Sequence, residues 1–175
     1  MRTLRFGVAV LLLASALQGQ RQADTSDEIG VVTLRDGTHS VPMKQSVPAR
    51  RARVGIFSSK QYFILGGPKA VIRTTNKTPV FEFVADPTLD EASDYYLFKF
   101  DMRSGSREIR VAKSTGGGLA ELKMPKDHII PTTVEAIGDG PNSTKRYRLK
   151  PTAHLRPGEY CLAKSIISYY DFGVD

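Results

Sequence analysis

The residues that could carry acid–base, nucleophilic or metal chemistry are scattered along the chain. The three histidines, His39, His128 and His154, occur singly, and no His-x-His or His-Glu-x-x-His spacing joins them. No Gly-x-Ser-x-Gly sequence is present, so the local signature of one large class of serine hydrolases is missing. The one cysteine, Cys161, lies in an apolar run, and we interpret it as a small core residue rather than a nucleophile. These patterns predict no catalytic, cofactor-binding or metal-binding residues.

Two further segments carry groups that could hold an ion. Residues 113–119, Lys-Ser-Thr-Gly-Gly-Gly-Leu, resemble a phosphate-cradling loop because successive glycine amides can point at an anion, but they lack the Gly-Lys-Ser/Thr order of a P-loop. Four carboxylates, Asp86, Asp90, Glu91 and Asp94, offer enough oxygen for Ca²⁺ without the spacing of an EF-hand. We interpret the first segment as a loop between strands and the second as a solvated acidic loop.

Positive charge is the clearest functional signal in the sequence. The 25 Lys and Arg residues outnumber the 18 Asp and Glu residues, which gives a formal net charge of +7. One basic cluster lies at 50–53, and a second forms the predicted anion-binding surface, Lys145, Arg146, Arg148 and Lys150. In a strand, alternation places Arg146, Arg148 and Lys150 on one face. Such a stripe attracts polyanions over about 8–10 Å at physiological salt, although charge on a sheet can also serve solubility alone.

The N-terminus has the layout of a secretory signal peptide. Two arginines precede an apolar run over 6–17, and Ala14-Ser15-Ala16 offers small residues for cleavage. The run is shorter than the roughly 20 residues that a membrane-spanning helix needs. We expect a signal peptide at 1–16 and a polar spacer at 17–28, followed by a protein that is exported to the periplasm or the medium and has no transmembrane segment after cleavage.

The elements that must position the charged residues are short strands separated by turns. Residues 29–41 predict a hairpin around Asp36-Gly37, because that dipeptide suits a two-residue hairpin turn. Residues 42–53 contain two prolines and little apolar content, so we interpret them as a connector. Over 54–175, β-rich runs alternate with turns at the spacing of a sandwich or a barrel. The sequence therefore predicts an N-terminal hairpin and connector at 29–53 and one β-sandwich domain at 54–175.

Alternation of apolar and polar residues indicates strands with one buried and one solvated face. The pattern is clearest over 95–102 and recurs at 107–112 and 146–150. Half-solvated strands favour antiparallel pairing. Helical periodicity is nearly absent, and short helices are expected only at 119–124 and near 132–137. We predict an all-β fold, namely an antiparallel β-sandwich with immunoglobulin-like architecture, preceded by the short N-terminal hairpin.

The stretch around Pro157-Gly158 is the most informative local signal for this architecture. A Tyr two residues after the glycine, Tyr160, predicts a tyrosine corner, in which the hydroxyl bonds to upstream backbone. True immunoglobulin domains add a cysteine pair and a buried Trp, whereas this chain has one Cys and no Trp. The prediction therefore covers sandwich architecture and not antibody-type topology, and stability must come from packing without an intrachain disulfide.

Several segments carry a resemblance that spans most of the chain after the signal peptide. They are Ile29-Gly30-Val31, Gly67-Pro68-Lys69-Ala70, Thr78-Pro79-Val80-Phe81-Glu82-Phe83, Arg107-Glu108-Ile109, Pro157-Gly158-Glu159-Tyr160 and Tyr170-Asp171-Phe172-Gly173-Val174-Asp175. Together they resemble a family of uncharacterised exported bacterial proteins, of the kind found in acidobacterial genomes. The resemblance implies bacterial origin and export, carries no activity or site residue, and implies that the glycosylation-type sequences at Asn76 and Asn142 are plain turns.

The sequence favours a binding protein over an enzyme. We expect a non-catalytic exported module for the cell envelope that engages a protein partner or an anionic polymer, such as lipopolysaccharide phosphates or acidic glycans. Nucleic acid ranks lower because no nucleic-acid-binding module is recognisable. The alternative is a hydrolase assembled from distant residues, for instance His128 or His154 with Asp or Glu partners. A third hypothesis makes Tyr169–Asp175 a strand exchanged with a neighbouring molecule, although we favour its being the last core strand.

Overall fold

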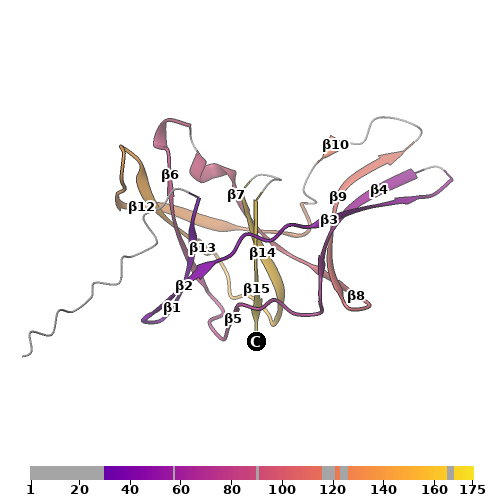
Figure 1. Cartoon of the computed structure of the whole chain (residues 1–175), viewed down its shortest axis with the longest axis horizontal. Coiled ribbons are helices and arrows are strands. Elements are labelled where there is room, and N and C mark those ends of the chain that lie inside the picture. Colours follow the sequence, from indigo (N-terminus) through magenta and orange to yellow (C-terminus); the bar gives the residue numbers. More distant parts are fainter. Residues whose placement is uncertain (1–29, 57, 90, 116–120, 123–125, 165–167) are drawn as a thin grey trace, which may run out of the picture.

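A computed structural model describes residues 30–56, 58–89, 91–115, 121–122, 126–164 and 168–175. Within these residues the chain forms fifteen strands and two short 3-10 helices, η2 (Pro87–Leu89) and η3 (Glu91–Asp94) (Figure 1). The predicted signal peptide, the polar spacer and most of the glycine-rich loop at 113–119 lie outside the described residues. The all-β, predominantly antiparallel sandwich that the sequence predicts is confirmed.

The strands form three sheets, which we call sheets A, B and C. Sheet A has the order β12 (Thr132–Asp139), β13 (Lys145–Pro151), β6 (Val80–Ala85), β1 (Val32–Asp36) and β2 (His39–Met43). Sheet B has the order β11 (Ile129–Ile130), β7 (Tyr95–Lys99), β14 (Gly158–Lys164), β15 (Ser168–Val174) and β5 (Arg73–Thr74). Sheet C has the order β10 (Glu121–Leu122), β9 (Ser106–Thr115), β4 (Ser58–Gly66) and β3 (Ala49–Val54), and β8 (Asp101–Arg103) also pairs with β9. All neighbouring strands are antiparallel except β15 and β5, which are parallel.

Sheet B is the middle layer between the other two sheets (Figure 1). Because side chains alternate along a strand, Tyr160 and Leu162 of β14 pack in a core shared with sheet A, whereas Cys161 and Ala163 pack in a core shared with sheet C. Sheet A contributes to the first core the buried side chains Val32, Leu34, Phe81, Phe83 and Leu149. Sheet C contributes to the second core the buried side chains Phe63, Leu65, Ile109 and Val111. The sandwich therefore has three layers and two cores.

The middle position of sheet B corrects one expectation from the sequence. We expected the strand at 95–102 to have one buried and one solvated face, but Tyr95 and Leu97 are buried in the first core, while Phe98 is buried in the second. Both faces of β7 are covered because sheet A lies on one side of it and sheet C on the other. The apolar run of this strand thus reflects burial on two sides.

The N-terminal hairpin forms as predicted, with a small shift of its turn. Asp36 pairs with His39, so the two turn residues are Gly37 and Thr38 rather than Asp36 and Gly37. Gly37 has a φ of 60° at the first turn position, which is the place where a type II′ turn takes glycine. The hairpin does not stand apart, because β1 pairs with β6 and so becomes part of sheet A.

Part of the predicted connector at 42–53 is wrong. Residues 49–54 form β3, an edge strand of sheet C that pairs along its whole length with β4. The basic cluster at 50–53 therefore lies on a sheet and not in a connecting loop. The strand was missed because its exposed positions are filled by arginine rather than by an apolar face.

Both short helices expected from the sequence are also wrong where the structure describes them. Residues 132–139 form β12, an edge strand with a bulge between Ala136 and Gly138, and most of its side chains are exposed. Of residues 119–124, Glu121–Leu122 form the short strand β10, and the others lie outside the described residues. An exposed edge strand has no buried face, so strict alternation of apolar and polar residues does not mark it as a strand in the sequence. Its scattered apolar residues were therefore interpreted as a short amphipathic helix.

The C-terminal residues complete the middle sheet. β15 pairs with β14 over all seven of its residues and with β5 at its end, and Tyr170, Phe172 and Val174 are buried in the first core. The hydroxyl of Tyr160 donates a hydrogen bond of 2.6 Å to the carbonyl oxygen of Arg156, which confirms the predicted tyrosine corner. The last segment is therefore a core strand of its own chain in this structure.

Candidate anion-binding surface

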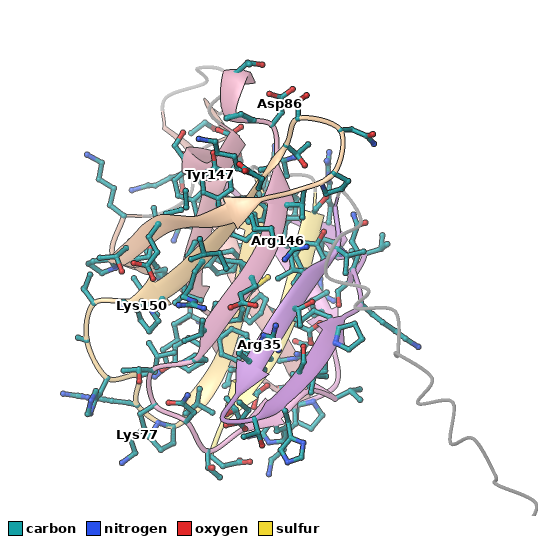
Figure 2. The ribbon with its side chains drawn as sticks, turned by 90° about the vertical axis from the view of Figure 1, so that its left-hand side faces the viewer. Arg35, Lys77, Asp86, Arg146, Tyr147 and Lys150 are labelled. Atoms are coloured by element: carbon teal, nitrogen blue, oxygen red, sulfur yellow. The ribbon has the colours of Figure 1, made fainter. Side chains whose placement is uncertain are left out.

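Three of the four residues of the predicted anion-binding stripe lie on the outer face of sheet A. β13 lies between β12 and β6, and Tyr147 of β13 packs against the first core. Alternation therefore turns Arg146, Arg148 and Lys150 to the opposite face, which is viewed directly in Figure 2. Lys145, at the start of β13, belongs to the face of Tyr147. The predicted period-two stripe thus exists, and the next question is how much of its charge remains uncompensated.

Glu82 of β6 neutralises one member of this stripe, Arg148. Arg148 donates hydrogen bonds from Nε and Nη2 to Glu82 Oε1 at 3.2 and 2.8 Å, and Arg35 of β1 donates from Nε to Glu82 Oε2 at 2.8 Å. Burial alone would raise the pKa of Glu82, but the hydrogen bonds from Arg148 and Arg35 outweigh it and hold that pKa below its ordinary value. A second carboxylate, Glu135, lies 3.7 Å from Arg148. Charges of both signs therefore line the open pocket of about 520 Å³ above these residues.

A second basic surface lies on the outer face of sheet C, where the sequence indicated only the cluster at 50–53. Phe63 and Leu65 of β4 face the core, so Lys60 and Tyr62 face away from it. The register places side chains in two adjacent rows across β3, β4 and β9, namely Arg53–Lys60–Lys113 and Arg51–Tyr62–Arg110. We call these five cations together with Tyr62 the sheet C basic face.

One buried carboxylate, Glu108 of β9, offsets part of this charge. Arg53 donates from Nη2 to Glu108 Oε2 at 2.7 Å, and Arg51 Nη1 lies 3.8 Å from Glu108 Oε1. The guanidinium of Arg53 also lies over the ring of Tyr62, 4.4 Å from the ring centroid. Glu108 and Tyr62 therefore hold Arg53 in place, and Glu108 compensates no more than one unit of positive charge.

The other cations of the sheet C basic face remain available to an anion. Lys60, Arg110 and Lys113 have no ion-pair partner among the side chains that the structure describes, which do not include Glu121 of β10, opposite Lys113 in the register. Neighbouring strands lie about 4.8 Å apart, and successive residues on one face lie about 7 Å apart along a strand. Lys60 and Lys113 therefore lie well within one Debye length of each other, which is about 8 Å at physiological salt, and Arg110 lies about one Debye length from Lys60. A patch of this kind suits a polymer with repeated anionic groups better than a single small anion.

The histidines and loop carboxylates do not gather in one place. His39 lies on β2 and His154 lies in the segment before β14, and both are exposed. His128 has its Nε2 at 3.7 Å from Asp127 and 3.9 Å from Asp101, two carboxylates that are more than half exposed. Across the described ranges, no group of three or more His, Cys, Asp or Glu side chains could hold a metal ion.

The acidic loop and the cysteine have local structural roles where they are described. Asp86 accepts hydrogen bonds from the backbone N–H and the hydroxyl of Thr88 at 2.8 and 2.7 Å, which caps η2. The side chains of Asp90 and Glu91 lie outside the described residues. Cys161 is fully buried in the second core, and burial raises the pKa of its thiol well above the ordinary value. A thiol that stays protonated and inaccessible matches the interpretation of Cys161 as a core residue.

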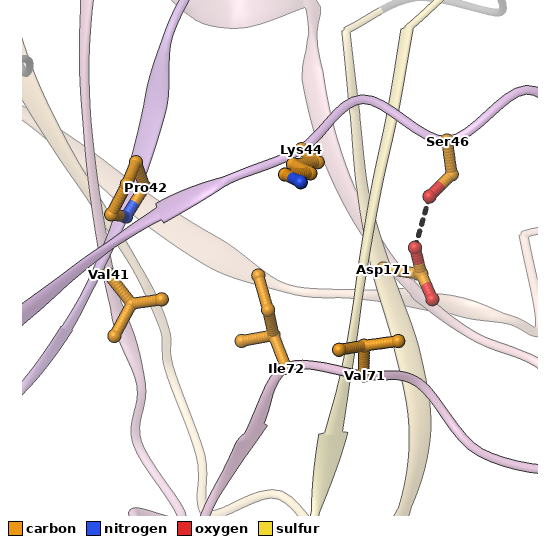
Figure 3. A pocket seen from close by; sticks show the side chains of 7 residues that line it. All are labelled: Val41, Pro42, Lys44, Ser46, Val71, Ile72 and Asp171. Carbon is orange, nitrogen blue, oxygen red and sulfur yellow. Dashed lines mark hydrogen bonds between the residues drawn. The ribbon is translucent and has the colours of Figure 1, made fainter.

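A separate pocket of about 340 Å³ opens beside β15 (Figure 3). Val41, Val71 and Ile72 form apolar walls, and Asp171 lies at its polar end. The hydroxyl of Ser46 donates a hydrogen bond to Asp171, and the backbone N–H of Ser46 donates to the carbonyl of Tyr169 at 2.6 Å. The carboxylate in this pocket is therefore already engaged by its own chain.

A buried ion network lies between sheets B and C. Arg107 of β9, whose side chain is 6% exposed, pairs with Asp171 of β15 and lies 3.8 Å from Glu159 of β14. Glu159 also accepts hydrogen bonds from the backbone N–H of Ala70 at 2.7 Å and from Arg73 Nη1 at 2.8 Å. Two arginines and two carboxylates thereby link β5, β9, β14 and β15.

Gly173 makes room for one arm of this network. Gly173 lies between Arg73 and Glu159 in the register of sheet B, and a Cβ at this position would lie 2.6 Å from Cζ of Arg73. The Arg73 side chain passes over the glycine to Glu159 and donates from Nε to Asp175 at 3.0 Å. The Gly-Glu-Tyr and Asp-Phe-Gly-Val-Asp sequences therefore have a structural role in holding the C-terminal strands together.

No family model, curated protein or solved structure matches this chain. Among the described residues, no helix is long and apolar enough to cross a membrane. The functional argument therefore depends on the surfaces of the molecule itself.

Proposed function

We propose that the protein is a non-catalytic exported binding module that holds an anionic polymer of the cell envelope on the sheet C basic face. The observation that carries this proposal is the set of three cations, Lys60, Arg110 and Lys113, that form no ion pair with a described side chain and lie in two adjacent rows beside Arg51 and Arg53. The stripe on sheet A is the weaker candidate, because Glu82 and Glu135 offset its charge.

The geometry of the sheet C basic face suits a polymer. A flat β-surface presents its cations at the regular spacings of the strands, so several phosphate or carboxylate groups of one polymer can be engaged at once. Each contact is weak at an exposed surface, and affinity comes from their number. Arg53 lies over the ring of Tyr62, which holds its guanidinium at a fixed place in this array of cations.

The test compares two variants that lose the same number of positive charges. The sheet C variant carries Lys60→Gln, Arg110→Gln and Lys113→Gln. The stripe variant carries Lys145→Gln, Arg146→Gln and Lys150→Gln, which leaves the Arg148–Glu82 contact in place. The readout is the salt concentration that elutes each protein from a heparin column, with the thermal midpoint as the control for folding.

We expect the sheet C variant to elute at clearly lower salt than the wild type, and the stripe variant to elute close to the wild type. The side chains substituted in the sheet C variant make no ion pair with a described side chain, so its thermal midpoint should stay within about 2 °C of the wild type, whereas the partly buried Arg146 makes the midpoint a necessary control for the stripe variant. Equal losses in both variants would mean that only net charge matters, and the proposed site would be wrong. A loss confined to the stripe variant would transfer the site to sheet A.

A further inference from the structure

The described residues of the turn between β3 and β4 include two large apolar side chains that are exposed. Val54 is 81% exposed and Ile56 is 93% exposed, and the turn is closed by a hydrogen bond of 2.7 Å from the N–H of Gly55 to the carbonyl of Ser58. In Figure 1 the ends of β3, β4 and β9 extend away from the layered body of the molecule. The apolar side chains therefore sit at the tip of a projecting hairpin and not over a core.

Cations follow immediately behind this tip. The pair Val54–Ser59 is the last pair of β3 and β4, and the next pair is Arg53–Lys60, which continues across to Lys113 of β9. One residue of a strand rises about 3.3 Å, so these charges lie within about 7 Å of the tip. In a bilayer, anionic headgroups lie outside the hydrocarbon. Apolar side chains at the end of a hairpin, followed one residue pair later by a row of cations, match these two layers.

We infer that the hairpin tip docks on a lipid surface with anionic headgroups, with Val54 and Ile56 inserted below the headgroups and Arg53, Lys60 and Lys113 at the level of the phosphates. This inference goes beyond the proposed function, because it assigns a lipid surface, rather than a polymer, to the cations at the hairpin end of the sheet C basic face. Charge complementarity selects the occupant: an apolar partner without anions would leave these cations unmatched, and a soluble polyanion would leave Val54 and Ile56 in water.

A tryptophan reporter tests insertion directly, because the chain contains no Trp of its own. The Ile56→Trp protein places a single reporter at the tip. The matched control is Val71→Trp, at an equally exposed apolar position that is 99% exposed and lies beside β5, away from the basic face. Each full-length protein is mixed with vesicles of phosphatidylcholine alone, with vesicles that also contain phosphatidylglycerol, and with soluble polyphosphate.

The Ile56→Trp emission should shift to shorter wavelength and be quenched by brominated acyl chains, only with vesicles that contain phosphatidylglycerol. The Val71→Trp emission should not change. Adding Lys60→Gln and Lys113→Gln to the Ile56→Trp protein removes two headgroup contacts of about 1 kcal/mol each, which lowers vesicle binding about 30-fold. The paired change Val54→Ser with Ile56→Ser should reduce vesicle binding and leave the elution from heparin unchanged.

Other outcomes would overturn the inference and still separate it from the proposed function. If the sheet C variant loses heparin retention but Ile56→Trp shows no blue shift with anionic vesicles, the lipid inference is wrong and the polymer proposal stands. If Val71→Trp shifts as much as Ile56→Trp, the tip is not the docking site. If heparin retention is unaffected by the sheet C variant, the proposed function fails, whatever the vesicles show.

Discussion

Replacing Gly173 with alanine should destabilise the protein through an arginine on the neighbouring strand. The new Cβ would lie 2.6 Å from Cζ of Arg73, so the guanidinium must leave its place. The side chain of Arg73 is long and partly exposed and can swing into solvent, so steric strain is not the main cost. The main cost is the loss of the hydrogen bond to Glu159, whose side chain is only 6% exposed.

The size of the effect follows from the contacts that are lost and kept. A hydrogen bond to a charged group contributes about 1.5–3 kcal/mol, whereas solvent weakens the contact of Arg73 with the half-exposed Asp175. Glu159 keeps its hydrogen bond from the backbone N–H of Ala70 and its longer contact with Arg107. Because Gly173 is not in the positive-φ region, alanine also lowers the entropy of the unfolded chain, a gain of about 0.4–1 kcal/mol. The net loss should be about 1–2.5 kcal/mol, or roughly 3–8 °C in Tm.

A double-mutant cycle with Arg73→Ala isolates this cause. In the Arg73→Ala background no guanidinium stands over position 173, so Gly173→Ala should be neutral or stabilise by about 0.5 kcal/mol. Urea unfolding followed by circular dichroism measures all four proteins. If Gly173→Ala costs the same in both backgrounds, Arg73 is not responsible and the assigned role of the glycine is wrong.

Two further predictions concern the charge on sheet A and the last strand. The pKa of Glu82 is lower in the folded protein than in the unfolded chain, so its stabilising contribution is complete at neutral pH and is lost as the pH falls from the unfolded pKa through the folded one. Between pH 7 and pH 3 the wild type should therefore lose more stability than Glu82→Gln, and parallel losses in urea unfolding at the two pH values would contradict this. Deleting 169–175 should abolish the cooperative unfolding transition, because β15 supplies buried residues to both cores; a folded monomer of the shortened chain would instead support strand exchange.

The sequence predicts the elements that have one buried face. Strands β9 and β13 and the N-terminal hairpin all follow clear alternation or turn signals and were located correctly. The exposed edge strands β3 and β12 were missed because neither has an apolar face to give the period. The third layer could not be predicted either, since a run such as Tyr95–Phe100 is compatible both with a strand buried on two sides and with a more apolar strand of a two-layer sandwich.

The candidate site, like the fold, could be predicted from the sequence only in part. The stripe on β13 was predicted because its cations lie two apart in the sequence, but its neutralisation by Glu82 depends on the pairing of β6 with β13, which the sequence does not reveal. The sheet C basic face joins cations from three strands that are far apart in the chain. A bulge between Gln61 and Tyr62 also shifts Lys113 onto the face of Arg110, which breaks the simple period of two. Of these cations, only the arginines at 51 and 53 belong to a basic cluster in the sequence, and that cluster was interpreted as part of the connector.

The central claim is that anions bind on the outer face of sheet C, and an NMR titration of the ¹⁵N-labelled protein with short-chain polyphosphate tests it most directly. The account predicts shift changes at Lys60, Arg110, Lys113 and their neighbours on β3, β4 and β9, with little change along β13. Shift changes centred on Arg146, Arg148 and Lys150, or no localised changes at all, would contradict it.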